Sequence, residues 1–349
     1  MSKSLKIGDL EVKIPVVQGG MGVGISLSGL AGNVSACGGL GVISTAQIGW
    51  REPDFYEKPF EANFRAIEKE IKKARELAKG GVLGVNIMVA TQRYEEYVKS
   101  AVKAGIDIVI SGAGLPIDLP KYVEGSKTKI APIVSSLKSL TVICRMWERK
   151  YQTAPDLVVI EGPKAGGHLG FSREELETVT DEAYDDVIVS IIEKVKEYSE
   201  KFSKKIPVVV AGGIYERKDM EHVMKLGADG DQMGTRFVTT KECDADEAYK
   251  QSYIKAKKED IKIVQSPVGM PGRAILNPFL EKVKTEKCKI KHCYQCIVTC
   301  DKKTIPYCIT EALVNAAEGR VDEGLLFCGE NAYRADKIET VAEIMEEFR

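Results

Sequence analysis

The sequence contains few histidines and no long apolar run. Its 349 residues include only three histidines and two tryptophans. No stretch of about 18 uninterrupted apolar residues, the length that spans a bilayer, occurs anywhere. Residues 1–15, MSKSLKIGDLEVKIP, lack the apolar core of a secretory signal. These absences predict a protein that neither spans a membrane nor is exported, and we expect it in the cytoplasm.

An excess of either charge is also missing. Fifty basic and 51 acidic residues give a formal net charge of −1, and 44% of the residues are hydrophobic. This composition is typical of a globular enzyme and not of a disordered or polyanion-binding chain. We therefore expect no nucleic-acid partner.

Eight short β-rich runs alternate with amphipathic segments. Helical periodicity is clear at Ile67, Ile71 and Ala74 and again at Ile188, Ile191 and Val195. Strands that are apolar on both faces and are followed by crossover helices indicate parallel β/α units. The runs lie at residues 14–20, 40–45, 82–88, 107–112, 130–135, 157–163, 206–213 and 230–238.

These units predict an α/β fold, a (β/α)₈ TIM barrel, with a doubly wound open sheet as the alternative. The eight runs span about 225 residues, which fits a barrel. Glycine or polar residues follow several different strands, and in a barrel all those strand ends meet at one mouth. A Rossmann sheet would need G-x-G-x-x-G at the first turn, where Ile25 replaces the third glycine.

The strand rhythm ends near residue 240. We therefore predict a barrel over residues 1–240. Over 241–349 we predict a helical and loop segment on the substrate side, with a cysteine-rich tail, that can include the last barrel helix. Residues 266–279, SPVGMPGRAILNPF, have the proline and glycine content of an ordered loop or lid.

Two glycine-containing turns predict a phosphate site. Gly212 and Gly213 follow the seventh run, and Gly234 and Thr235 follow the eighth. Loops after strands 7 and 8 bind phosphate in many TIM barrels, because glycine frees backbone N–H groups to face the anion. Either pair alone could also serve only to shape a tight turn. Together they favour a ligand that carries a phosphate.

Among the histidines, His168 is the best candidate for a functional role. It lies in a glycine-rich loop just beyond the sixth run, where an imidazole with a pKa near neutrality could exchange protons with a substrate. His222 and His292 have the surroundings of ordinary surface residues. The amides of Gln18, Asn86 and Gln232 could either contact a heteroaromatic ring or cap turns.

The nine cysteines are odd in number and unevenly spread, which argues against a disulfide framework. Five of them, Cys288, Cys293, Cys296, Cys300 and Cys308, form a cluster whose spacing matches neither a zinc ribbon nor a ferredoxin run. Iron–sulfur or zinc binding is one hypothesis for the cluster. Free thiols without a metal are the other, which we favour.

The motifs IPVVQGGMGVGIS, GGLGVIST, GVNIM, EGPKAGGHLG, VVVAGGI and DQMGTRF together resemble the nitronate monooxygenase family and the related flavin-dependent enoyl-acyl-carrier-protein reductases. The resemblance runs from about residue 12 to residue 280 and implies an FMN-binding TIM barrel. It identifies His168 as the catalytic residue. The residues it implies for FMN are Gln18, Gly19, Gly20 and Asn86 near the ring, Glu161, Gly166 and Gly167 along the cofactor, and Gly212, Gly213, Gln232, Met233, Gly234 and Thr235 at the phosphate end.

The chain departs from the family at two positions beside His168. Glu161 stands where the family commonly has Gln, and Lys164 where it has Glu, so the local charge differs. The resemblance implies oxidation of alkyl nitronates with O2 to a carbonyl compound and nitrite. The alternatives are reduction of an enoyl thioester with NAD(P)H and, from another class, flavin binding without turnover. A homodimer is compatible with each.

Overall fold

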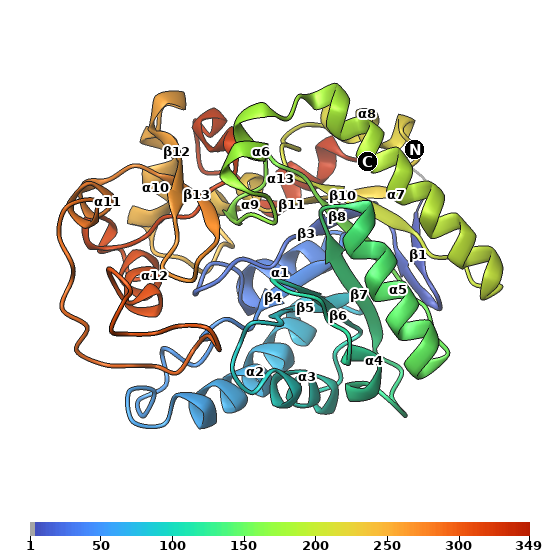
Figure 1. Ribbon diagram of the computed structural model, residues 1–349, viewed down its shortest axis with the longest axis horizontal. Helices are drawn as coiled ribbons and strands as arrows, with labels where there is room; N and C mark the ends of the chain where they lie inside the picture. Colours follow the sequence, from blue (N-terminus) through green and yellow to red (C-terminus); the bar gives the residue numbers. More distant parts are fainter. Residues whose placement is uncertain (1–3) are drawn as a thin grey trace.

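The computed structural model describes residues 4–349, and its centre is a barrel of eight parallel strands. All eight predicted strands are present, which confirms the TIM barrel (Figure 1). In spatial order they are β3 (Val16–Gln18), β11 (Gly230–Met233), β10 (Val208–Ala211), β8 (Val158–Glu161), β7 (Lys129–Val134), β6 (Ile108–Gly112), β5 (Leu83–Met88) and β4 (Gly41–Ser44). Leu40 pairs with Val17 and closes the ring between β3 and β4.

Helices follow the strands and surround the barrel (Figure 1). They are α1 (Ser28–Ala36), α2 (Pro59–Leu77), α3 (Tyr94–Lys103), α4 (Leu119–Tyr122), α5 (Leu137–Tyr151), α6 (Arg173–Thr178), α7 (Asp181–Lys201), α8 (Arg217–Lys225) and α9 (Thr235–Val238). Among the described residues, no helix has the length and apolar character needed to cross a bilayer.

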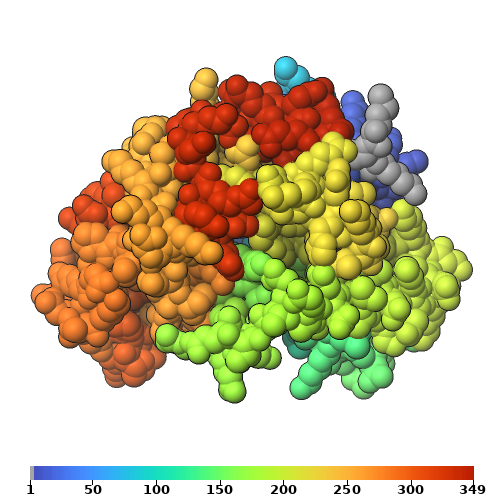
Figure 2. Space-filling model, turned by 90° about the horizontal axis from the view of Figure 1, so that it is seen from above, coloured from blue at the N-terminus to red at the C-terminus, as the bar shows by residue number. Residues whose placement is uncertain are grey.

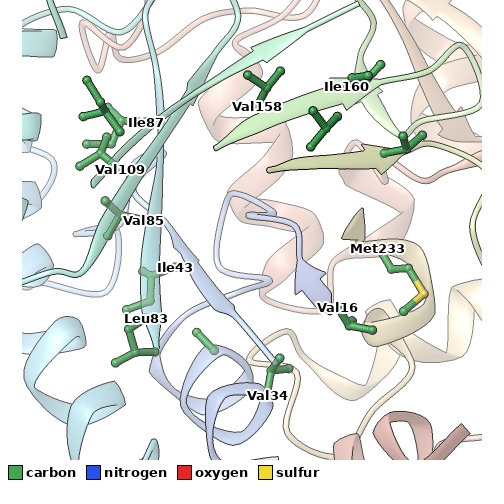
Figure 3. Close-up of a cluster of buried hydrophobic side chains, with 14 of the residues drawn as sticks. Val16, Val34, Ile43, Leu83, Val85, Ile87, Val109, Val158, Ile160 and Met233 are labelled. Carbon is green, nitrogen blue, oxygen red and sulfur yellow. The ribbon is translucent and has the colours of Figure 1, made fainter. Parts of the chain in front are cut away.

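The main core lies between the strands and these helices. Val16, Ile43 and Val85 lie on the strands and are fully buried, and Val34 of α1 belongs to the same cluster (Figure 3). Alternate strand residues such as Val17 and Val42 belong to a second cluster inside the barrel. The strands are therefore apolar on both faces, as parallel strands covered by helices require.

An N-terminal hairpin, which the sequence analysis did not predict, contributes to the interior cluster. Strands β1 (Leu5–Ile7) and β2 (Leu10–Val12) pair antiparallel, and Leu5, Ile7 and Val12 pack with the inward-facing residues of the barrel strands. In Figure 1 the hairpin lies across the molecule from α11 (Pro278–Val283) and α12 (Ile309–Ala317).

Residues after 240 do contain strands, so the expectation of only helices and loops was wrong. β12 (Ile261–Gln265) and β13 (Pro271–Ile275) form a hairpin, and β13 also pairs with β9 (Gly167–His168). The run SPVGMPGRAILNPF thus includes an ordered strand and not only a loop. This three-stranded sheet joins the C-terminal segment to the loop that carries His168.

The C-terminal segment gathers on one side of the barrel and then returns to it (Figures 1 and 2). Its other helical elements are α10 (Glu247–Lys255), η1 (Lys258–Asp260), η2 (Val321–Glu323), η3 (Glu330–Arg334) and α13 (Val341–Glu347). Val341, Ile344 and Phe348 join the main core, and α13 packs against α1. The segment is therefore inserted between β11 and the last helix of the outer layer.

Candidate active site

A cavity of about 410 Å³ opens where the carboxyl ends of the barrel strands meet. This is the end of a TIM barrel at which catalytic residues are found. Every strand contributes to the lining: Gly19 after β3, Ser44 in β4, Asn86 in β5, Gly112 in β6, Val134 in β7, Glu161 in β8, Gly212 after β10 and Gln232 in β11.

The C-terminal segment supplies the rest of the wall. Its contribution is largely apolar or aromatic and comprises Tyr249, Tyr253, Met270, Cys296, Ile297, Ile309, Thr310, Leu313, Phe327, Cys328 and Gly329. The hydroxyl of Tyr253 donates to the backbone oxygen of Phe327 at 2.6 Å, which fixes two of these residues to each other. The sequence predicted a substrate-side segment after residue 240 but not these individual residues, because they come from separate helices and loops.

Glycines bring the backbone close to its neighbours in this cavity. A Cβ atom at Gly20 would lie 2.3 Å from the Cβ of Asn86, and one at Gly166 would lie 2.6 Å from the backbone of Cys328. Contacts below 3.0 Å do not occur between real side chains, so only glycine fits at these positions. Glycine at these two positions therefore lets the cavity wall pack closely on itself. Beside Gly167, which also lines the cavity, an added Cβ would meet no atom within 4 Å, so the space there is open.

The predicted phosphate turn has a backbone that requires glycine. Gly212 and Gly213 have φ values of 97° and 88°, in the left-handed region. A Cβ at Gly212 would lie 2.9 Å from the backbone oxygen of Gly162, so the β10 turn touches the loop after β8. The hydroxyl of Thr235 accepts a hydrogen bond from the N–H of Gly329 at 2.8 Å.

Two of the predicted site residues do not line the cavity. The amide of Gln18 is fully buried and is bound to backbone across the β3–β4 seam, because its Nε2 donates to Val42 and its Oε1 accepts from the Val42 N–H at 3.0 Å. Gly213 faces the side chain of Lys164, and its carbonyl accepts from Asn331 at 2.6 Å. The others do line it: Gly19, Gly20, Asn86, Glu161, Gly166, Gly167, His168, Gly212, Gln232, Met233, Gly234 and Thr235.

His168 is held by both its backbone and its ring. Its backbone pairs with Gly272 of β13, and its Nε2 lies 2.7 Å from the Oγ of Ser266. The edge of its ring meets Phe327, with ring centroids 4.9 Å apart and planes inclined at 65°. These contacts fix the imidazole at the cavity wall.

The expected near-neutral pKa of His168 was wrong. Burial of the ring disfavours its charged form and lowers the pKa to about 4. The imidazole is therefore neutral at pH 7. It can accept or donate one hydrogen bond there, but it cannot attract an anion by carrying a positive charge.

Glu161, at the end of β8, has the pKa closest to neutrality in the cavity wall. Burial raises the pKa of its carboxyl group to about 7. Among the described lining residues, Glu161 and Lys164 are the ones with ordinarily charged side chains. Lys164 is paired with Asp181 at 2.6 Å, which leaves Glu161 as the group able to change the charge of the cavity around pH 7. The sequence gave Glu161 no role in proton transfer.

The other two histidines lie elsewhere. His222, on the outer helix α8, pairs with Asp185 at 2.9 Å. His292 packs edge-on against Tyr294, with ring centroids 4.8 Å apart. Neither is among the residues that line the cavity.

The cysteine cluster reaches the cavity at one point. Cys296 lines the cavity, whereas Cys293 is exposed and Cys288, Cys300 and Cys308 are partly buried, and all are free thiols. Within residues 4–349, no three His, Cys, Asp or Glu side chains lie close enough together to hold a metal ion.

Comparison with known proteins places this barrel and cavity in a family. The family model described as nitronate monooxygenase matches residues 3–349, so the chain belongs to the nitronate monooxygenase family. A probable nitronate monooxygenase of Staphylococcus saprophyticus is 26% identical over 299 residues, 79% of each chain. Another, of Staphylococcus haemolyticus, is 25% identical over 311 residues, 79% of this chain and 78% of its own.

Solved structures of two other proteins share the fold of this chain. FabK from Thermotoga maritima superposes with a TM-score of 0.72 at 26% identity, covering 97% of this chain and 92% of FabK. A nitroalkane oxidase from Streptomyces ansochromogenes, at 19% identity, shares the fold with a TM-score of 0.71 over 97% of this chain and 95% of its own. Membership of this family makes the chain an oxidoreductase enzyme.

Proposed function

We propose that the protein is an FMN-dependent nitronate monooxygenase that oxidises alkyl nitronates with O2 to a carbonyl compound and nitrite. The family match and the curated relatives support this activity. The observation that carries it is the cavity itself, whose lining combines glycines at the ends of several strands with one fixed neutral imidazole.

The residues present fit a phosphate-bearing flavin. The space beside Gly167 in the cavity wall is open, and the turns at Gly212 and at Gly234–Thr235 follow the adjacent strands β10 and β11, where barrels bind phosphate. We assign the ring end of FMN to Gly19, Gly20 and Asn86. Gly212, Gln232, Met233, Gly234 and Thr235 would hold the phosphate end, with Gly166 and Gly167 between. Gln18 and Gly213 would support these turns from behind.

Bound FMN would supply the electron transfer and the reaction with O2. The chain's own residues would bind and orient the substrate. His168, neutral and anchored to Ser266, would accept a proton from a neutral nitroalkane or donate a hydrogen bond to the nitro oxygen of a nitronate. Glu161, when protonated, would keep the cavity free of negative charge that repels an anion.

One observation favours a second function. FabK, an enoyl-acyl-carrier-protein reductase, is as similar in sequence as the curated monooxygenases and covers more of the chain. The same cavity could place an enoyl thioester beside the flavin, with NAD(P)H as the electron donor. His168 would then help to protonate the product.

Parallel assays separate the two functions. FMN-loaded protein should consume O2 and release nitrite with propionate-3-nitronate, and it should consume little NAD(P)H with crotonyl thioester. NAD(P)H consumption that depends on the thioester, without turnover of nitronate, would establish the reductase instead. Failure to bind FMN would refute both.

A further inference from the structure

The cysteine segment contains a C-x-x-C pair whose two thiols face different environments. Cys293 is exposed to solvent, whereas Cys296 is half-buried and lines the cavity. Closely spaced cysteine pairs of this form are used for reversible disulfide chemistry. The short segment between the two thiols therefore connects the protein surface to the cavity wall.

Packing holds the segment between the two cysteines. Gln295, which lies in it, has a φ of 51°, in the left-handed region. Tyr294 is buried and stacks on Phe55, with ring centroids 5.2 Å apart. The anchored ring fixes the short piece of backbone that carries Cys293 and Cys296.

Residues 296–298 are hydrogen-bonded to the barrel segment 90–92. The N–H of Gln92 donates to the carbonyl of Cys296 at 3.1 Å, and the N–H of Val298 donates to Ala90 at 2.9 Å. Thr91 and Ile297, which form a bridge between these bonds, both line the cavity. A change at Cys296 therefore acts directly on the wall.

The charge of the Cys293 thiolate also affects the pKa of the Cys296 thiol. Burial raises the pKa of Cys296, the nearby Cys293 raises it further, and a hydrogen bond with Thr310 opposes both. Thr310 itself lines the cavity. Lys289 and Lys291, close to Cys293 in the sequence, are exposed, and their positive charges favour the approach of anionic reagents.

We propose that Cys293 and Cys296 form a redox-active site that reacts with low-molecular-weight disulfides of the glutathione type. The thiolate of exposed Cys293 attacks the disulfide RSSR, forms a mixed disulfide and releases one RS⁻. The thiolate of Cys296 then attacks the Cys293 sulfur, forms the internal disulfide and releases a second RS⁻. The two protons lost by the cysteines neutralise the two RS⁻, so two protein thiols and RSSR give one protein disulfide and two RSH.

The internal disulfide would alter the cavity wall. Bonding to Cys293 draws the Cys296 sulfur away from the hydroxyl of Thr310 and constrains the segment, residues 296–298, that is hydrogen-bonded to residues 90–92. The oxidation state of the cell's small thiols would then set the shape of the cavity mouth. This site needs no flavin and does not depend on the proposed function.

The test is equilibration of the full-length protein in buffers of reduced and oxidised glutathione. Acid quenching, differential alkylation and peptide mass spectrometry then locate the disulfide. We expect two thiols per chain to disappear in the oxidising buffers, a disulfide linking Cys293 to Cys296, and full reversal by dithiothreitol.

Single variants provide the controls. Cys293→Ser and Cys296→Ser should each abolish the internal disulfide, and Cys296→Ser should leave a stable mixed disulfide on Cys293. Cys37→Ser and Cys300→Ser should retain it. The proposal is overturned if both thiols stay fully alkylable in oxidised glutathione, if wild type stops at the mixed disulfide, or if Cys296 pairs instead with Cys300, with Cys308 or with a second chain.

Discussion

Glu161 and His168 line the same cavity, and burial displaces their pKa values in opposite directions. The carboxyl pKa rises to about 7 and the imidazole pKa falls to about 4. Burial disfavours the charged form in both cases, which for an acid raises the pKa and for a base lowers it. Near pH 7 the titrating group of this pair is therefore the glutamate.

This relationship predicts the pH dependence of nitronate oxidation. Below about pH 7 Glu161 is neutral, and above it the carboxylate repels an anionic nitronate. For preformed nitronate, kcat/KM should therefore decrease above pH 7, by at most about tenfold per pH unit. Steady-state rates between pH 5.5 and 9 would measure this decrease.

Glu161→Gln is the matched variant, because it keeps the shape of the side chain and removes the ionisation. Its profile should lack the decrease above pH 7. If the decrease persists unchanged in Glu161→Gln, another group causes it and the role given to Glu161 is wrong.

Replacement of His168 by Asn should separate proton transfer from binding. FMN should remain bound, because the backbone pairing of residue 168 with Gly272 is retained. Activity on a neutral nitroalkane should decrease by roughly 10²-fold or more, and activity on preformed nitronate should decrease less. Equal losses on both substrates would mean that His168 positions the substrate, and wild-type rates would exclude a catalytic role.

Gly212→Ala tests the phosphate turn. The new Cβ would lie 2.9 Å from the backbone oxygen of Gly162 and would displace the loop after β8, so affinity for FMN should fall at least about tenfold. Gly105→Ala is the control, because Gly105 also has a positive φ, 78°, but has no atom within 4 Å of the added Cβ. Fluorescence titration with FMN should show normal affinity in the control. Equal affinities in the two variants would place the phosphate elsewhere.

Substitution of Asp231 should increase the free energy of unfolding, which is unusual for a buried residue. Its side chain is fully buried in β11, and within the described part of the chain neither carboxylate oxygen has a hydrogen-bond partner. Asp231→Val removes an unpartnered acid and places a β-branched residue in a strand. At pH 8 it should raise the free energy of unfolding by about 1–3 kcal/mol.

The gain should depend on pH in a defined direction. Burial raises the pKa of Asp231 well above its ordinary value, so the folded state holds the proton more tightly than the unfolded state. This contribution to stability is full below about pH 4 and is lost as the pH rises toward the folded-state value. Denaturation at pH 5 and pH 8 should show a larger gain at pH 8, whereas exposed Asp336→Asn should change little. An unchanged free energy of unfolding at pH 8 would show that the buried Asp231 carboxyl group costs no stability.

The barrel could be predicted because its signals are local. Each strand is a short apolar run, and glycine or polar residues mark the ends that meet at the mouth, as Gly112 and Gly212 do. His168 could be found in the same way, since its glycine-rich loop directly follows β8. The hairpin at Leu5–Val12 escaped detection because its two strands have only three residues each.

The rest of the site depends on contacts between distant segments. Ser266 lies 98 residues from His168 in the chain, and no spacing rule links them. The pKa values of Glu161 and His168 follow from burial in the folded chain, where Phe327 packs against His168, and the sequence cannot reveal this burial. The same holds for Gln18, whose amide a sequence pattern cannot distinguish from one that faces a ligand.

Turnover of propionate-3-nitronate by FMN-loaded protein, measured as O2 consumed and nitrite released, tests the proposed activity most directly. We expect the two rates to agree, to require FMN and to decrease in His168→Asn. A protein that binds FMN but releases no nitrite from any alkyl nitronate, while it oxidises NAD(P)H in the presence of an enoyl thioester, would contradict it.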